Sequence, residues 1–287
     1  MKKVVLAYSG GLDTSYCLKY LKNEKGYEVH TVLINTGGFD NEELQAIEDR
    51  AYELGSAKHA NLTILDKYYD KAIKYLIYGN VLKNNTYPLS VSAERVFQAI
   101  EAIKYAKSVG ASAIAHGSTG AGNDQIRFDL IFQTIAPEIE IITPIRDLKL
   151  SRQEEVDYLA KNGVHYSWEK AQYSINKGLW GTSVGGKETL TSHEALPSEA
   201  YPSQLQKQGE EKVTLEFNEG QLVAVNGKKD TPPNNIVILE KLANAYAIGR
   251  DIHVGDTIIG IKGRVGFEAA APLIIIKAHH LLEKHTL

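Results

Sequence analysis

Residues 7–15, which read Ala-Tyr-Ser-Gly-Gly-Leu-Asp-Thr-Ser, place two glycines among several hydroxyl side chains. They directly follow the apolar run 4–6, so the order predicts a buried strand, a glycine turn and the start of a helix. The first turn of a helix offers unpaired backbone N–H groups and the positive end of its dipole, and glycines let the backbone approach an anion closely. Further donors are the hydroxyls of Ser9, Thr14 and Ser15. The segment is therefore expected to bind an anion such as a pyrophosphate.

A second glycine-rich segment, residues 116–128, also follows an apolar strand and precedes a helix. It is not a Walker loop, because Asn-Asp stands where Lys-Ser/Thr is required, and its glycine spacing differs from the dinucleotide fingerprint. Within nine residues it presents a hydroxyl, an amide, a carboxylate and a guanidinium, from Thr119, Asn123, Asp124 and Arg127. This mixture favours a zwitterionic amino acid, since it has partners for both ammonium and carboxylate. The alternative is a polar turn capped by Asp124, which a second glycine loop in the same sheet makes less favoured.

Strand-like apolar runs alternate with helical patterns through the first half of the chain. Strands are expected at residues 3–7, 30–35, 60–65, 113–116 and 140–143, and helices at residues 14–23, 42–54, 93–109, 129–136 and 152–162. This alternation predicts an α/β fold with a parallel sheet covered by helices on both faces. Residues 164–211 are rich in polar and turn types with little periodicity. From residue 212, short strands and one helix at residues 235–246 predict a smaller α+β domain.

Length and composition bound the possible functions. A chain of 287 residues suggests two domains, and its net charge of −3 argues against a dedicated nucleic-acid binder. The single cysteine, Cys17, excludes an internal disulfide and fits a reducing compartment. No apolar run reaches the length of a membrane span, and the chain begins with a strand where a signal peptide would lie. A cytoplasmic protein without membrane or nucleic-acid partners is expected.

With both glycine segments described, the chain resembles the argininosuccinate synthase family of the adenylating ATP pyrophosphatases. The resemblance covers essentially all 287 residues and rests on residues 7–15, 86–89, 115–128, 173–175, 179–181 and 260–262. Many ATP pyrophosphatases share the first of these blocks, whereas the block at 115–128 is far more specific. The resemblance implies a parallel-sheet nucleotide-binding domain of the adenine nucleotide alpha-hydrolase type at residues 1–165. It also implies a smaller α+β synthetase domain at residues 166–287.

The resemblance implies ATP-dependent ligation of citrulline and aspartate to argininosuccinate, a step of arginine biosynthesis that releases AMP and pyrophosphate. A ureido carbon is a poor electrophile, so its oxygen would first attack the α-phosphate to give a citrullyl-adenylate. The amine of aspartate would then displace AMP. Such a reaction needs positioning and charge stabilisation rather than a protein nucleophile. No nucleophile–His–acid arrangement is recognisable in the sequence.

Residue by residue, the resemblance implies three sets of binding positions. Those for ATP are Ala7, Tyr8, Ser9, Gly10, Gly11, Leu12, Asp13, Thr14, Ser15, Ile34 and Gly117. Those for aspartate are Thr119, Asn123 and Asp124, and those for citrulline are Tyr87, Ser92, Asn123, Arg127, Ser174 and Ser183. Asp13 and Asp124 are the candidate catalytic residues, and no metal ligands are assigned. Asp13 would repel bare phosphate, so either Mg²⁺ or a bond to the loop backbone must compensate, and Mg²⁺ with ATP is favoured.

The sequence departs from the family pattern at the amino-acid end of the citrulline site. Gly255 stands where the family has a glutamate, and Phe267 stands where it has a tyrosine. One explanation is a shifted alignment in which Asp256 or Glu268 takes over, and this explanation is favoured. The other is that the enzyme accepts an N-acylated citrulline, whose blocked amine needs no carboxylate partner.

Length is a second departure, because family members continue into a C-terminal extension that assembles a homotetramer. The sequence alone therefore leaves the assembly and full activity of a chain ending at residue 287 open.

Two other functions remain as alternatives. Another ATP pyrophosphatase, such as an RNA-thiolating enzyme or an amide synthetase, would need further cysteines and a basic surface, or a glutaminase nucleophile. A catalytically impaired nucleotide-binding homologue would not need the polar residues of the second segment, which are intact in this chain.

Overall fold

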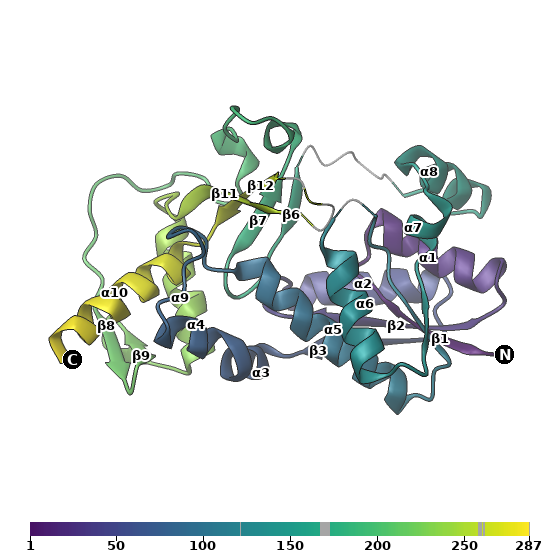
Figure 1. Ribbon diagram of the computed structural model, residues 1–287, viewed down its shortest axis with the longest axis horizontal. Coiled ribbons are helices and arrows are strands. Elements are labelled where there is room, and N and C mark those ends of the chain that lie inside the picture. Colours follow the sequence, from purple (N-terminus) through teal and green to yellow (C-terminus); the bar gives the residue numbers. More distant parts are fainter. Residues whose placement is uncertain (121, 167–172, 258–259, 261, 287) are drawn as a thin grey trace.

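A five-stranded sheet forms the centre of the N-terminal half (Figure 1). The computed structural model describes residues 1–120, 122–166, 173–257, 260 and 262–286. The strand order is β3-β2-β1-β4-β5 and every pair is parallel. The strands are β1 (Lys3–Ala7), β2 (Glu28–Asn35), β3 (Lys58–Thr63), β4 (Ala113–Ala115) and β5 (Glu140–Ile142). The predicted α/β fold with a parallel sheet is thereby confirmed.

Helices cover both faces of this sheet because its strands are apolar on both sides. Val4 and Leu6 point into one core and Val5 into the other, and all three side chains are fully buried. The first core is closed by α1 (Leu12–Asn23), α2 (Asn41–Glu53), α7 (Pro144–Leu148) and α8 (Arg152–Lys161). The second is closed by α5 (Ser90–Ser108) and α6 (Asp124–Ile135).

Most of the expected helix and strand boundaries lie within three residues of those observed, but the helix predicted from residue 129 is an exception. It begins five residues earlier, at Asp124, so Asp124 and Arg127 lie on a helix and not on a loop. The prediction was wrong because the first helical turn is polar, whereas the periodic apolar pattern begins only after it. Asn123 is the N-cap residue, and its side chain makes no capping hydrogen bond, so Asp124 is not the cap.

The C-terminal half contains two antiparallel sheets and two long helices. One sheet has the order β10-β9-β8, from β8 (Leu215–Asn218), β9 (Gln221–Val225) and β10 (Lys228–Lys229). The other has the order β11-β12-β7-β6, from β6 (Ser174–Asn176), β7 (Thr182–Gly185), β11 (Arg250–Asp256) and β12 (Lys262–Glu268). The helices are α9 (Pro232–Asn244) and α10 (Ala270–Thr286), with 3₁₀ turns η2 (Lys187–Leu190) and η3 (Ser198–Ala200). The expectation of a single helix after residue 212 was therefore wrong.

A third core joins the two halves of the chain. Its N-terminal part is a helical segment that the sequence did not predict: α3 (Leu65–Tyr68), the π-helical turn η1 (Tyr69–Ile73) and α4 (Lys74–Tyr78). Tyr68 and Ile73 of this segment pack with Trp180 and with Ile236 of α9. The indole Nε1 of Trp180 donates a hydrogen bond to the carbonyl of Pro88 at 2.9 Å. The division of the chain at residues 165 and 166 remains a prediction.

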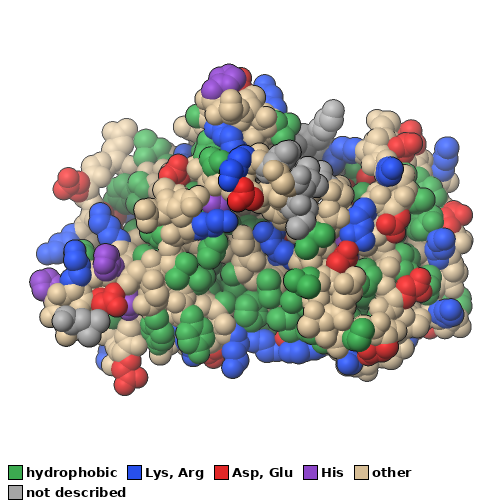
Figure 2. All heavy atoms as spheres, viewed as in Figure 1, with side chains coloured by type: hydrophobic (Ala, Val, Ile, Leu, Met, Phe, Trp, Pro, Cys, Tyr) green, Lys and Arg blue, Asp and Glu red, His purple; other side chains and the backbone are tan. Residues whose placement is uncertain are grey.

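The surface carries both signs of charge. Figure 2 shows Lys and Arg side chains interspersed with Asp and Glu over the visible face. Within the described residues, no helix has both the length and the apolar composition needed to cross a bilayer.

Replacing Trp180 by alanine is expected to destabilise the protein strongly. The side chain is fully buried, so its removal leaves a cavity and an unpaired carbonyl at Pro88, which costs about 3–5 kcal/mol. Chemical unfolding monitored by circular dichroism measures this loss. Leu190→Ala is the control, because Leu190 is 88 % exposed, and its effect should stay within about 0.5 kcal/mol. Equal effects of the two substitutions on stability would contradict the burial of Trp180 in the third core.

Candidate active site

The first glycine segment forms the turn between β1 and α1. Gly10 has φ +75°, and a Cβ there would lie 3.0 Å from the side chain of Ile47, so glycine is required. Thr14 Oγ1 donates to the carbonyl of Gly11 at 3.2 Å, which orders the first turn of α1. A guanidinium from α2, that of Arg50, donates to the carbonyl of Gly10 at 2.7 Å. The turn is thus rigidly held, with the N-terminus of α1 and the exposed Ser9 at its surface.

Asp13, in the first turn of α1, faces a second, buried carboxyl group. Glu155 of α8 is only 3 % exposed, and its Oε2 has no hydrogen-bond partner among the described residues. Burial, together with the charge of Asp13 and a hydrogen bond with it, raises the pKa of Glu155 to about 8. The raised pKa favours the protonated form of the Glu155 carboxyl group at neutral pH. The sequence patterns gave no sign of this partner for Asp13, since the two residues are far apart in the chain.

The second glycine segment touches the first. A Cβ at Gly117 would lie 3.3 Å from Asp13 Cβ and from Thr14 Cγ2, so the two loops pack closely at this position. The base of the second loop is fixed by Asp129 of α6, which accepts from His116 Nε2 at 2.9 Å and from Arg146 at 2.7 Å. Burial alone would raise the pKa of Asp129, but these two hydrogen bonds lower it.

Asp124, at the start of α6, lies between two guanidinium groups. It pairs with Arg127 at 2.6 Å and with Arg95 of α5 at 3.1 Å. A second nitrogen of Arg127 donates to Ser92 Oγ at 3.4 Å. Three of the predicted binding residues are thus brought together: Ser92, Asp124 and Arg127.

Arg95 was missed by the sequence analysis although it connects several parts of the site. Besides Asp124, it donates to Asn176 Oδ1 of β6 at 2.7 Å and to Glu94 Oε1 at 3.0 Å. Its position three residues after Ser92 on the same helix was the available signal, because side chains at that spacing share a face.

Glu94 connects α5 to the end of β2. Its side chain is 2 % exposed, and burial raises its pKa to about 7, against the opposing effect of Arg95. Gln98 donates to Glu94 Oε1 at 3.0 Å and to Thr36 Oγ1 at 3.3 Å. Ile34, predicted to contact adenine, is buried at this end of β2 and its carbonyl accepts from Gln98 at 3.5 Å.

One face of the four-stranded sheet carries the remaining predicted residues. Ser183 of β7 lies opposite both Phe267 and Asn176, and Ser174 is two residues from Asn176, so these side chains share a face. The ring of Tyr87 lies 5.2 Å from the ring of Phe267 on this face. Tyr87, Ser174 and Ser183 are therefore brought to one surface. Thr119 is exposed on the second loop.

The two residues expected to compensate for Gly255 behave differently. Glu268 points to the opposite face, where it accepts from Ser203 Oγ at 2.5 Å and pairs with Arg250 at 2.8 Å. It does not compensate, because its position next to Phe267 on a strand reverses its direction. Asp256 pairs with Lys262, and its carbonyl accepts from Asn123 Nδ2 at 3.5 Å, which places the end of β11 beside the second loop.

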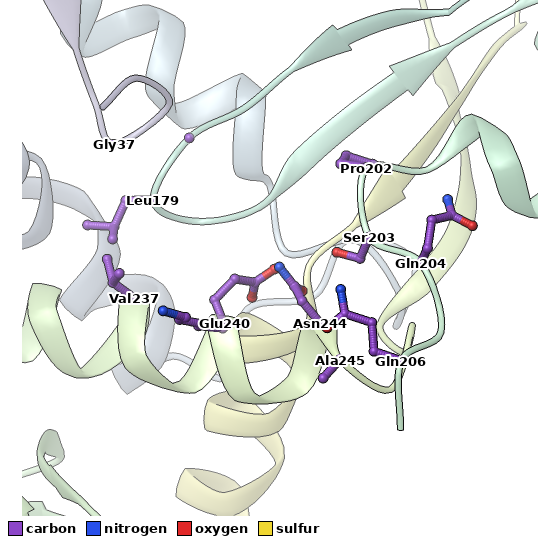
Figure 3. Close-up of a pocket in the computed structure, with 12 residues that line it drawn as sticks. Gly37, Leu179, Pro202, Ser203, Gln204, Gln206, Val237, Glu240, Asn244 and Ala245 are labelled. Carbon is purple, nitrogen blue, oxygen red and sulfur yellow. The ribbon is translucent and has the colours of Figure 1, made fainter. Parts of the chain in front are cut away.

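A separate cavity of about 590 Å³ lies between α9, Leu179 and residues 202–206 (Figure 3). None of the predicted binding residues lines it. Burial raises the pKa of Glu240 in its wall to about 7, and Glu240 accepts from the backbone N–H of Ala271 at 2.7 Å. Its carboxyl group thus caps the start of α10.

Comparison with known proteins decides the family. The family model described as "Arginosuccinate synthase N-terminal HUP domain" matches residues 3–165, and "Arginosuccinate synthase C-terminal domain" matches residues 173–287. The chain belongs to the argininosuccinate synthase family. The predicted family and the predicted ligase class are thereby confirmed.

Three relatives named "Argininosuccinate synthase" illustrate the similarity. The protein of Methanocaldococcus jannaschii is 38% identical over 283 residues, covering 98% of this chain and 71% of the relative. That of Xylella fastidiosa is 39% identical over 295 residues, with coverage of 98% and 71%. That of Pyrococcus furiosus is 37% identical over 289 residues, with coverage of 99% and 70%.

The raised pKa of Glu155 predicts how the stability of this argininosuccinate synthase homologue changes with pH. The folded chain retains a proton that the unfolded chain releases near pH 4.5, so the stabilising contribution is complete below that pH and is lost as pH rises through about 8. Glu155→Gln removes the titrating group, so the variant does not lose this stability as pH rises. The melting temperature of the variant relative to the unmodified protein should rise from about pH 5 to about pH 8 and then level off. Calorimetry across this range measures the difference.

Glu154→Gln is the matched control, because the pKa of Glu154 is shifted in the opposite direction to that of Glu155. Glu154 is exposed, and its capping hydrogen bonds with Ser151 lower its pKa. The contribution of Glu154 to folding stability is present above the pKa of the unfolded state and is lost as pH falls. The Glu154→Gln variant should therefore be less stable than the unmodified protein at neutral pH and equally stable in acid. The same pH trend in both variants would refute the assignment for Glu155.

Proposed function

We propose that this chain ligates citrulline and aspartate to argininosuccinate at the expense of ATP, with release of AMP and pyrophosphate. One observation carries the proposal: the two glycine loops touch at Gly117 and Asp13. An α-phosphate held by the first loop would therefore lie beside the amino-acid groups of the second. Family membership supports the same reaction.

The ATP half of the proposed site is the turn from β1 to α1. The residues proposed to hold ATP are Ala7, Tyr8, Ser9, Gly10, Gly11, Leu12, Asp13, Thr14, Ser15, Ile34 and Gly117. Backbone N–H groups and hydroxyls at the N-terminus of α1 suit the triphosphate. The buried end of β2 suits the adenine ring, because Ile34 offers an apolar contact there.

The amino-acid half lies around α6 and the four-stranded sheet. We assign aspartate to Thr119, Asn123 and Asp124, and citrulline to Tyr87, Ser92, Asn123, Arg127, Ser174 and Ser183. The pairing of Asp124 with two guanidinium groups holds both signs of charge at one place, which suits zwitterionic substrates.

In this arrangement the ureido oxygen of citrulline attacks the α-phosphate, a C–O–P bond forms and pyrophosphate leaves. The amine of aspartate then attacks the ureido carbon, and the C–O bond to AMP breaks. The chain orients the reactants and balances charge, and we propose Asp13 near the phosphates and Asp124 near the attacking amine as the catalytic carboxylates.

Mg²⁺ is proposed to bind together with ATP. The described residues include no group of three His, Cys, Asp or Glu side chains placed to hold a metal. Mg²⁺ is often held by substrate phosphates with one or two carboxylates, and Asp13 is a carboxylate in the first turn of α1. The ion would supply positive charge to the phosphates. EDTA should abolish turnover and excess Mg²⁺ should restore it.

The location of the enzyme, its domain division and its assembly are also proposals. We infer a cytoplasmic enzyme with small-molecule substrates, with an ATP-binding domain at residues 1–165 and a synthetase domain at residues 166–287. Light scattering would test whether this chain forms the family homotetramer. Neither an N-acylated citrulline nor an impaired homologue is favoured, given relatives named argininosuccinate synthase over 98% of the chain.

The proposed reaction predicts the fate of one oxygen atom. With citrulline carrying ¹⁸O in its ureido group, mass spectrometry should find the label in AMP, since that oxygen attacks phosphorus. Omission of ATP, citrulline or aspartate should each prevent argininosuccinate formation. Unlabelled AMP, or pyrophosphate release without citrulline, would contradict the mechanism.

Arg127→Gln should selectively weaken the binding of citrulline. Loss of a charged hydrogen-bond donor beside Ser92 is expected to raise the KM for citrulline by about tenfold or more, whereas the KM for ATP stays near its original value. Steady-state kinetics measure both constants. Lys229→Gln, at an exposed position in β10, is the control and should change neither.

A further inference from the structure

His253 lies on the face of the four-stranded sheet that carries the proposed citrulline residues. Asp251, two residues before it, lies opposite Phe267, which in turn lies opposite Ser183. His253 therefore points to the same side as Ser183. Its ring stacks on Tyr87 with centroids 4.6 Å apart and planes 20° apart. No motif included this residue.

The imidazole of His253 occupies the space that a side chain at position 255 would need. A Cβ built on Gly255 would lie 2.7 Å from His253 Nε2, closer than such contacts occur. Nε2 therefore lies beside Gly255, and the carbonyl of the next residue, Asp256, accepts from Asn123 of the second loop at 3.5 Å. The polar end of the ring therefore lies near the end of β11 that is next to the second loop.

The other ring nitrogen indicates where the proton is. Nδ1 of His253 is buried and has no hydrogen-bond partner among the described residues. A buried N–H without a partner is rarer than a buried acceptor without one, so the neutral ring carries its proton on Nε2. Burial and the charge of Lys83 both lower the pKa of His253, which keeps the ring neutral. The site therefore offers an N–H donor beside a positive charge.

An N–H donor beside a positive charge suits an anionic ligand. Asp256, the carboxylate that follows Gly255 on the strand, pairs with Lys262, and Phe267 offers no hydrogen bond. We propose that His253 determines citrulline specificity by donating its Nε2–H to the α-carboxylate of bound citrulline. The inference rests on the proposed function, and it assigns to the histidine a contact at the place where Gly255 removes one.

His253→Phe isolates the polar contact, because phenylalanine keeps the stack on Tyr87 but has no ring nitrogen. The KM for citrulline should rise about tenfold or more, whereas the KM for ATP and that for aspartate stay within about twofold. With citrulline amide, which lacks the carboxylate charge, the variant and the unmodified protein should have similar KM values. His193→Phe, at an exposed position, is the control and should change no constant.

Gly255→Ala tests the shared space. It should raise the KM for citrulline in the unmodified protein, because the new methyl group displaces Nε2. In a His253→Ala background the same substitution should have no further effect. The melting temperature of each variant shows whether the fold is intact.

The outcomes separate this inference from the proposed function. An active unmodified enzyme with an unchanged citrulline KM in His253→Phe overturns the role of His253 alone. Equal loss on citrulline and on its amide also overturns it, since the carboxylate would then not be the partner. An unmodified enzyme that forms no argininosuccinate overturns the proposed function and this inference together.

Discussion

The ion pairs of Arg95 determine how the elements of the site meet. From the first turns of α5, this guanidinium reaches Asp124 on α6, Asn176 on β6 and its own neighbour Glu94. The side chain is 13 % exposed, so water screens these charges weakly. Removing one partner of such a pair leaves an uncompensated charge, which is costly, and the network therefore has one favoured geometry.

The arrangement of the amino-acid half follows from this constraint. Asp124 is held from one side by Arg95, so Arg127 approaches it from the other and reaches Ser92. Asn176 ties the face of the four-stranded sheet to the same guanidinium. A residue outside every motif thus orients the motif residues from three parts of the chain, and the glycine loops supply the backbone around them.

The sequence indicated the local features of this fold and missed the distant ones. The β1–α1 turn, the second glycine loop and the parallel sheet each follow from short-range patterns, and the structure contains all three. The segment of α3, η1 and α4 was missed because its helical turns are short and because several packing partners, among them Trp180 and Ile236, lie more than a hundred residues away. Glu155 and His253 were missed for the same physical reason. The burial of Glu155 beside Asp13 and the stacking of His253 on Tyr87 are properties of the folded chain.

Glycine residues serve two structural purposes in this site, and only one of them can be recognised from the sequence. Gly10 has a positive φ, which glycine adopts without strain, and this conformation forms the turn between β1 and α1. Gly178 and Gly255 instead make room for a side chain: a Cβ at Gly178 would overlap the carboxylate of Glu94, and one at Gly255 would collide with His253. A glycine in place of a family residue is then not a simple loss, since another side chain fills the space. At Gly255 the space is taken by His253, two residues earlier on the same strand, and the contact proposed for this histidine is to the carboxylate of citrulline rather than to its amine.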